Sequence, residues 1–183
     1  MTTTTTTATA TETATVDPGA ALPPAPGRTL EPKELQRWVD EAAANPQWWS
    51  HLVRHDTGGR HFASLYRDGD LDVWVLCWNT ADDTGWHDHD TSSGAVAVTR
   101  GAVTEANPRM GGEPVVRTVG AGRSFAFGPD HIHRMAGAVD GSVSIHAYSP
   151  PLWRMGQYSI TPSGVMRRLS ISYADELRPL DPS

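Results

Sequence analysis

The sequence predicts an all-β fold, a single jelly-roll-like β-barrel preceded by one or two short N-terminal helices. Short apolar segments dominate from residue 60 onward, turn-forming residues separate them, and a helical pattern lies before them. Many short strands divided by Gly, Pro and Asp turns are typical of sandwiches and barrels. A chain of 183 residues can bury the core of one such domain.

Residues 1–28 differ in composition from the rest of the chain. They are rich in Thr, Ala and Pro and have no apolar periodicity. Such a segment cannot bury enough apolar surface to offset the entropy lost on ordering. It lacks the basic stretch and apolar core of a secretory signal, and its one basic residue, Arg28, is poor support for a targeting role. We therefore predict a disordered tail at 1–28 and a barrel domain at 29–183.

The first predicted elements are helical. The segment 29–49 begins with Glu31 and Pro32, which suit a first turn, and continues with apolar residues at helical spacing (Leu35, Trp38, Val39 and Ala42). Asn45-Pro46 interrupts this pattern. The apolar residues that follow predict a second short helix (Trp48, Trp49, Leu52 and Val53).

Strand patterns occupy the remainder of the chain. Residues 72–78 (DVWVLCW) form a near-continuous apolar run, and residues 94–99 lead through Arg100-Gly101 into 102–105 in the pattern of a β-hairpin. Further strands are predicted at 114–119, 124–127 and 142–149, with two more inside 156–173 around a turn at 161–164. We expect the tryptophans of this region to fill the core rather than line a pocket (Trp74, Trp78, Trp86 and Trp153).

Charge and cysteine content exclude several classes of protein. The formal charge of −6 and the pI near 5.7 argue against nucleic acid or an anionic membrane as the main partner. No apolar run approaches the roughly 20 residues that span a bilayer. The single cysteine, Cys77, rules out an internal disulfide framework and is expected to pack in a core strand. We expect a cytoplasmic monomer or small homo-oligomer.

Histidines provide the strongest indication of chemistry. Five of the eight fall in three short segments, and the first of these is the His87-x-His89 pair. Side chains at i and i+2 of a strand project to the same side, so both imidazoles can face one interior as metal ligands. Asp88 and Asp90 then point the other way, where they are solvated or brace the strand. In isolation, the same pattern also fits two surface histidines on a polar loop.

The wider spacing resembles that of cupin barrels, in which an HxH motif is followed by an acidic residue and a glycine. Here His87 and His89 are followed by Gly94 in the place of the acid and by Gly101 at the expected distance. The second cupin motif consists of a glycine, a turn residue and a histidine, and matches the order Gly122, Gly128 and His133.

The second motif also separates two candidate ligands. His133 keeps the cupin step from Gly128, whereas His131 is two residues early, although strand alternation would place it on the same face. We therefore predict a mononuclear iron bound by His87, His89 and His133, with His131 as a mouth residue or a hydrogen-bonding neighbour.

The absent acid has a chemical consequence. Three neutral imidazoles leave Fe(II) with its full charge, whereas a site with a carboxylate has already neutralised one unit. Such a site suits an anionic ligand supplied by the substrate, and a thiolate is an obvious candidate because metal coordination deprotonates a thiol. The alternative is a zinc or nickel site with a structural or sensory role.

With these motifs, residues 60–173 resemble the cysteine dioxygenase (thiol dioxygenase) family, ferrous cupins that oxidise a thiol to a sulfinic acid. The resemblance rests on WHDH (86–89), IHR (132–134) and, most specifically, SIHAYSPP (144–151). In that family a Ser-x-His-x-Tyr strand ending in Ser-Pro-Pro lines the iron pocket. The resemblance implies that Tyr148 donates a proton or hydrogen bond to dioxygen or substrate, and that His146 and Ser144 orient it.

The residues of this strand support part of that role independently. Ser144, His146 and Tyr148 alternate with apolar residues and so share one face. Buried polar groups need mutual hydrogen bonds, which a Ser–His–Tyr relay provides. The alternative is a network that only fixes the strand. We further hypothesise a cis peptide bond at Ser149-Pro150.

Two departures from the family concern the pocket. Animal members cross-link the pocket tyrosine to a cysteine just after HxH, but Gly94 stands there and no such thioether can form. The family binds the substrate carboxylate with an arginine in a Tyr-x-Arg segment, where an ungapped count places Ser64. Arg60 and Arg67 flank that position, and either guanidinium could form the bidentate clamp; equally, the clamp could be lost.

The sequence thus predicts an iron-dependent thiol dioxygenase that oxidises L-cysteine to cysteine sulfinate with O2, housed in the domain at 29–183. One alternative is a dioxygenase for another small thiol such as 3-mercaptopropionate. A second is a non-catalytic metal-binding cupin. An isomerase or hydrolase would need a carboxylate base in the pocket, and no such residue stands out.

Overall fold

The N-terminal part of the fold is helical. The computed structural model describes residues 22, 27–55, 59–161 and 165–172, so nearly all of the tail predicted at 1–28 lies outside the described residues. Helix α1 (Pro32–Ala44) is capped at Glu31 by a capping box with Glu34, and is followed by α2 (Pro46–Trp49) and the 3-10 turn η1 (Ser50–Leu52). None of the described helices has the length and apolarity needed to cross a membrane.

Strands make up the rest of the described chain. They are β1 (His61–Arg67), β2 (Asp72–Trp78), β3 (Trp86–Asp88), β4 (Ser93–Arg100), β5 (Ala102–Asn107), β6 (Val115–Gly120), β7 (Arg123–Phe127), β8 (Arg134–Gly137), β9 (Ser142–Ser149), β10 (Arg154–Ile160) and β11 (Met166–Ser172). The bounds of β2 and β9 match the predicted strands. The turn predicted at 161–164 lies mostly outside the described residues.

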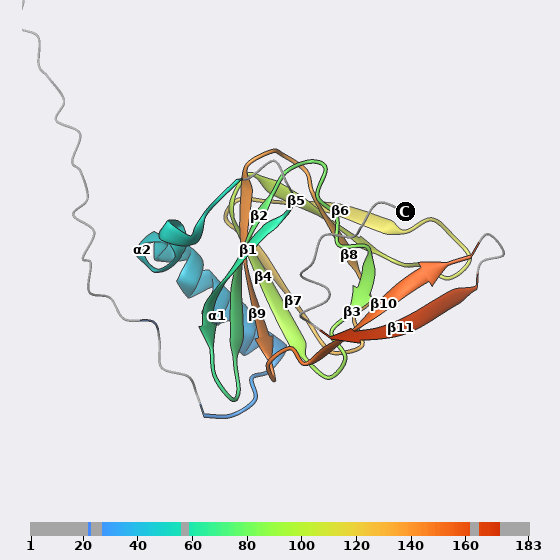
Figure 1. Ribbon diagram of the computed structural model, residues 1–183, viewed down its shortest axis with the longest axis horizontal. Helices are drawn as coiled ribbons and strands as arrows, with labels where there is room; N and C mark the ends of the chain where they lie inside the picture. The colour runs from blue at the N-terminus through green and yellow to red at the C-terminus, as the bar shows by residue number, and fades with distance from the viewer. Residues whose placement is uncertain (1–21, 23–26, 56–58, 162–164, 173–183) are drawn as a thin grey trace, which may run out of the picture.

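The strands form antiparallel sheets with a jelly-roll-like arrangement of the cupin type, as predicted. The largest sheet has the order β1-β2-β9-β4-β7, and two three-stranded sheets have the orders β11-β10-β3 and β6-β5-β8. Figure 1 shows the two smaller sheets opposite the large one, with the helices on its outer side. The sheets face one another without closing into one continuously hydrogen-bonded barrel.

The large sheet has two buried faces with different functions. Strand β9 directs Val143, Ile145 and Ala147 to a cluster that includes Leu35 and Val39 of α1. Its alternate residues face the interior between the sheets. Cys77 belongs to the helix-side cluster and is 2% exposed, which confirms its predicted packing role. The helix side is therefore apolar core, whereas the interior holds a second apolar cluster together with buried polar groups.

The hairpin predicted at 94–105 is wrong. Strand β4 pairs with β7 and β9, whereas β5 pairs with β6 and β8 in another sheet. The chain changes sheets at Gly101, whose φ of 68° suits glycine. There the Ser142 Oγ accepts a 2.9 Å hydrogen bond from the Ala102 amide.

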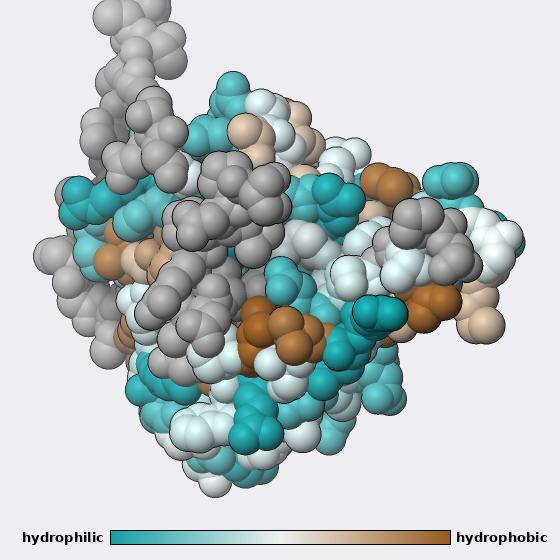
Figure 2. Space-filling view, turned by 45° about the vertical axis from the view of Figure 1, so that its right-hand side comes forward, coloured by the Kyte–Doolittle hydropathy of each residue, from teal (hydrophilic) through white to brown (hydrophobic). Residues whose placement is uncertain are grey.

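The four tryptophans occupy three kinds of environment. Trp74 and Trp86 are half-buried, and Trp74 lines a cavity, so the prediction that it fills the core rather than lining a pocket is wrong. Trp78 is completely buried in the interior cluster, as predicted. Trp153 is 73% exposed, so the core prediction for it is wrong. It directly precedes β10 and so lies outside the strands, whose alternate side chains the sheets bury. The hydrophobic residues visible on the surface in Figure 2 form separate patches among hydrophilic and neutral ones.

We expect Leu35→Ala to lower the free energy of unfolding by about 2–5 kcal/mol, because it leaves a cavity between α1 and the large sheet. Urea denaturation followed by far-UV circular dichroism measures the change. Glu41→Ala, at an exposed position of the same helix, should stay within about 0.5 kcal/mol of wild type. Equal losses in both variants would contradict the packing assigned to α1.

Candidate metal centre

Three histidines from two separate segments converge in the interior. His87 lies on β3, His89 follows its end, and His133 directly precedes β8. Each offers a ring nitrogen, and these nitrogens all lie within 4.8 Å of one another. The backbones of His87 and His133 exchange two hydrogen bonds, of 2.9 and 3.0 Å, which fix the two side chains next to each other. The three predicted ligands are therefore brought together.

In the rings of both His87 and His133, one nitrogen is hydrogen-bonded and the other is left for the cluster. The Nδ1 of His87 lies 3.1 Å from the carbonyl of Gly85, and the Nδ1 of His133 lies 3.0 Å from Oε1 of Glu105. A carbonyl and a carboxylate accept, so we assign the proton to Nδ1 and the lone pair to Nε2 in both rings. Among the described residues, neither the Nε2 of His133 nor either nitrogen of His89 has a hydrogen-bond partner.

Buried nitrogens without partners fit a bound metal ion. A polar atom that is buried without a hydrogen bond costs about 1–3 kcal/mol, and coordination supplies the missing partner. Burial and the neighbouring imidazoles lower the pKa of His87 and of His89 well below the ordinary value, and burial also lowers the pKa of His133. All three rings are thus neutral near pH 7, which is the form that binds metals.

Gly94 explains why this site has no acidic ligand of the cupin kind. A Cβ at this position would collide with the ring of Phe127 and would lie 3.1 Å from Cδ1 of Tyr148. The Phe127 ring instead packs 4.8 Å from that of His89. The place of the cupin acid is therefore occupied by an aromatic ring from β7.

A polar relay lines the interior face of β9. The Oγ of Ser144 lies 2.8 Å from Nε2 of His146, and Nδ1 of His146 lies 3.2 Å from the hydroxyl of Tyr148. The indole Nε1 of Trp78 donates to the same Ser144 Oγ at 2.8 Å. These groups are nearly or completely buried. The predicted relay is present and extends by one residue to Trp78.

Trp78 gives this relay a direction. An indole N–H can only donate, so the Ser144 Oγ accepts from Trp78. We assign the hydroxyl proton of Ser144 to Nε2 of His146, its other side-chain partner. His146 then carries its proton on Nδ1 and donates it to the Tyr148 oxygen, while the Tyr148 proton is left for an acceptor on its other side. Burial lowers the pKa of His146 to about 3, so the ring is neutral at pH 7.

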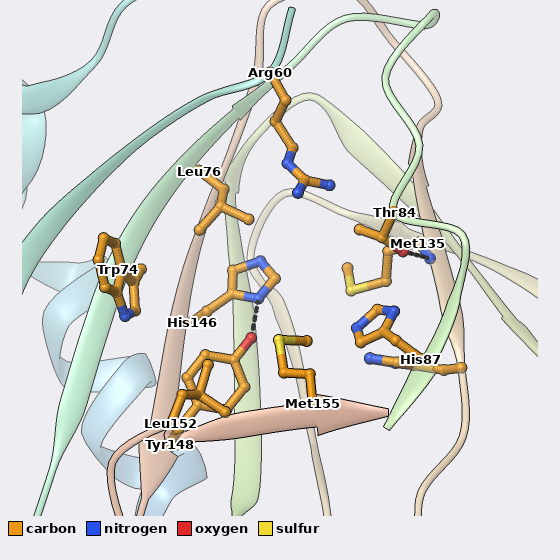
Figure 3. A pocket seen from close by; sticks show the side chains of 11 residues that line it. Arg60, Trp74, Leu76, Thr84, His87, Met135, His146, Tyr148, Leu152 and Met155 are labelled. Atoms are coloured by element: carbon orange, nitrogen blue, oxygen red, sulfur yellow. Dashed lines mark hydrogen bonds between the residues drawn. The ribbon is translucent and has the colours of Figure 1, made fainter. Parts of the chain in front are cut away.

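A cavity opens beside the histidines and the relay. Its volume is about 50 Å³, roughly four times the 10–15 Å³ that a water molecule requires. Figure 3 shows the guanidinium of Arg60 extending into it above His87 and His146. The described lining residues include no acidic side chain, and are Arg60, Trp74, Leu76, Thr84, His87, His133, Met135, His146, Tyr148, Leu152 and Met155.

The two candidate arginines occupy different environments. Arg60 lies in the cavity lining, with its guanidinium carbon 5.1 Å from the centre of the Trp78 ring. Arg67 is absent from the described lining, and forms a 2.8 Å ion pair with Asp72 and a 3.1 Å hydrogen bond to the carbonyl of Leu152. Ser64 is exposed. The cavity thus has Arg60, and not Arg67, beside the histidines.

Glu105 is a site residue that the sequence analysis missed. Its side chain is completely buried on β5 and contacts both His131 and His133. Burial opposes ionisation, but hydrogen bonds from the two histidines and Arg117 lower the pKa of its carboxyl below the usual range. The sequence does contain one indication of this role. Glu105 lies two residues after Val103 in a predicted strand, so the two side chains share a face, and that face is buried. His131 is a hydrogen-bonding neighbour, one of its two predicted roles.

Asp88 braces the strand between the two ligands, one of its two predicted roles. Its carboxylate accepts hydrogen bonds from Arg168 at 2.7 and 2.9 Å, from the Tyr158 hydroxyl at 2.6 Å and from the Gly156 amide at 2.9 Å. These donors lie on β10 and β11. The predicted cis bond at Ser149-Pro150 is also present.

The chain is similar to several known proteins. A family model described as "Cysteine dioxygenase type I" matches residues 27–161. Cysteine dioxygenase type 1 of Danio rerio is 24% identical over 136 residues, which covers 67% of each chain. A double-stranded β-helix protein from Klebsiella pneumoniae is 16% identical with a TM-score of 0.49, over 55% of this chain and 80% of that one. KdgF from Halomonas is 18% identical with a TM-score of 0.46, over 56% and 92%.

The direction assigned to the relay predicts that His146 carries its proton on Nδ1. Long-range proton–nitrogen NMR correlation on histidine-labelled protein distinguishes the two tautomers. In Trp78→Phe the donor to Ser144 is lost, so we expect a mixture of tautomers and a loss of about 1–3 kcal/mol in unfolding free energy. A wild-type His146 protonated on Nε2 would reverse the relay and contradict its assignment.

Proposed function

The chain belongs to the cysteine dioxygenase type I family, and from this premise we propose that it is an iron-dependent dioxygenase that oxidises L-cysteine to cysteine sulfinate. The observation that carries the proposal is that the cluster of three imidazoles contributes His87 and His133 to the same small cavity that Arg60 and the Tyr148 relay line. The reaction is RSH + O2 → RSO2H, in which sulfur loses the four electrons that dioxygen gains, so no external reductant is needed.

His87, His89 and His133 are the residues that would hold ferrous iron. The nitrogens of His89 and His133 that lack a hydrogen-bond partner among the described residues support a bound metal. Because the three ligands are neutral imidazoles and include no carboxylate, the site suits an anion supplied by the substrate. When bound, iron supplies the Lewis acidity that favours a thiolate over a thiol, and the redox chemistry that dioxygen requires.

Arg60 is the residue that we propose for the substrate carboxylate. It is the one arginine among the described lining residues, and it faces the same cavity as His87 and His133. A small substrate can therefore direct its sulfur to the histidines and its carboxylate to the guanidinium. The size of the cavity favours a substrate of a few heavy atoms.

Tyr148 is the proposed proton donor at the reacting atoms. The relay leaves its hydroxyl proton directed away from His146, and its ring lies 5.1 Å from that of His89. His146 and Ser144 hold the phenol in this orientation, and the apolar residues of the lining limit access of water.

A second substrate is supported by one observation. The described lining has no acidic side chain that could pair with the ammonium group of cysteine. 3-Mercaptopropionate has the same spacing between sulfur and carboxylate and no ammonium group, so the cavity also suits this thiol.

We propose further that the activity resides in the domain predicted at 29–183 and operates in the cytoplasm. Ferrous iron and a free thiol substrate both need a reducing compartment. The lone Cys77 is buried on the helix side of the large sheet, away from the cavity.

The proposal predicts oxygen uptake that depends on both iron and a thiol. Protein loaded anaerobically with ferrous iron is mixed with oxygen and L-cysteine, 3-mercaptopropionate or no thiol. We expect His87→Ala to lose iron, and Tyr148→Phe to keep iron but to turn over about 10²–10⁴-fold more slowly, as for loss of a general acid. Bound iron without uptake for any thiol would favour the non-catalytic cupin instead.

The assignment of Arg60 predicts a difference between the two arginines. Arg60→Ala should lower kcat/KM for L-cysteine by about 10–100-fold, the equivalent of one lost hydrogen bond between charged groups. Cysteamine, which has no carboxylate, should be affected much less. Arg67→Ala should reduce thermal stability, because Asp72 is completely buried, but should keep kcat/KM within about twofold. A larger kinetic loss in Arg67→Ala would reverse the assignment.

A further inference from the structure

Glu105 connects three side chains behind the candidate metal centre. Its Oε1 accepts hydrogen bonds from Nδ1 of His133 at 3.0 Å and from Nε2 of His131 at 2.9 Å. Its Oε2 accepts a 2.6 Å hydrogen bond from Nε of Arg117, and the two side chains also form an ion pair. The two carboxylate oxygens thus accept from different donors: Oε1 from the two histidines and Oε2 from Arg117.

The contact with Arg117 restricts the ionisation state of Glu105. Its side chain is 52% exposed, and its guanidinium lies over the Phe125 ring at 4.5 Å. A guanidinium has five donors and no acceptor. The atom facing Arg117 must therefore be an acceptor, and the ionised carboxylate is the one form of this side chain that offers acceptors to Arg117 and to His133 at once.

The same contact fixes the state of His133. Because Oε1 accepts from Nδ1, the proton of the neutral ring is on Nδ1 and the lone pair is on Nε2. That Nε2 is buried, has no hydrogen-bond partner among the described residues, and belongs to the group of nitrogens within 4.8 Å of one another. Carboxylate contacts of this kind orient metal-binding histidines and raise their basicity.

We propose that Glu105 is a positioning residue that holds His133 as a metal ligand through the hydrogen bond to its Nδ1. The proposal rests on the proposed function in so far as that function assigns a metal to His133. At Gly94 the Phe127 ring occupies the space that a side chain would need, so no carboxylate joins the ligands from that position. Glu105 contacts the ligand His133 from β5, in another sheet, and Arg117 pairs with its charge.

A purely structural role for Glu105 is the competing explanation. Its partners lie on β6 and just before β8, so its hydrogen bonds also tie the sheet β6-β5-β8 together. Loss of such a brace would lower stability but would leave the metal affinity of the folded protein unchanged. Metal affinity is therefore the measurement that separates the two roles.

The first test is the affinity of full-length Glu105→Gln for Co(II), a stand-in for ferrous iron that does not oxidise in air. Arg117 attracts the carbonyl of the new amide, so the NH2 group turns to His133, which must then accept on Nδ1 and carry its proton on Nε2. We expect affinity to fall by about 10–100-fold. Adding Arg117→Met removes the competing donor, lets the amide carbonyl face His133 and should restore part of the affinity.

Two controls belong to this test. Glu113→Gln removes an exposed carboxylate from the β5–β6 connection and should bind Co(II) like the wild type. Arg117→Met alone keeps the Glu105 charge and should cost less affinity than Glu105→Gln. Wild-type affinity in folded Glu105→Gln, or a double variant that binds more weakly than Glu105→Gln, would overturn the proposal.

The second test needs no variant, in case Glu105→Gln does not fold. Histidine-labelled wild-type protein without metal should show His133 protonated on Nδ1 in long-range proton–nitrogen correlation. A proton on Nε2 would overturn the positioning role. Wild-type protein that binds no Co(II) but has the Nδ1 tautomer would instead contradict the proposed function, so the two failures are distinguishable.

Discussion

The backbone hydrogen bonds between His87 and His133 are the constraint on which the rest of the site depends. They join β3 to the segment before β8, across the gap between two sheets that share no continuous ladder. Each imidazole is thereby held in a buried position that it would not occupy alone, because a buried polar atom needs a partner. The surroundings then satisfy one nitrogen of His87 and of His133 and leave the other for the cluster.

The charges around the centre are arranged so that few of them lie in the cavity. Burial keeps His87, His133 and His146 of the lining neutral, and Arg60 is the one cation of the described lining. The carboxylate of Glu105 lies behind His133, and that of Asp88 lies on the far side of its strand, where Arg168 pairs with it. In a site of low dielectric, this arrangement favours a ligand that brings its own negative charge.

Patterns within single strands could be predicted from the sequence, whereas contacts between strands could not. The alternation of 142–149 gave the Ser144–His146–Tyr148 face, and the HxH spacing gave two ligands. The register of β1 shifts between Ser64 and Tyr66, so an ungapped count could not decide between the arginines on either side. Residues 94–105 alternate in the same way whether or not the two strands pair, which produced the false hairpin. Glu105 was missed because its partners Arg117 and His133 come from other segments.

The proposed function requires that both atoms of dioxygen reach the sulfur of a thiol at the histidine centre. The most direct measurement is mass spectrometry of the product formed by the iron-loaded protein from L-cysteine under ¹⁸O2. We predict a sulfinate in which both oxygen atoms are labelled. Disulfide with hydrogen peroxide, or a sulfinate whose oxygen comes from water, would contradict the claim and leave a metal-binding cupin without dioxygenase activity.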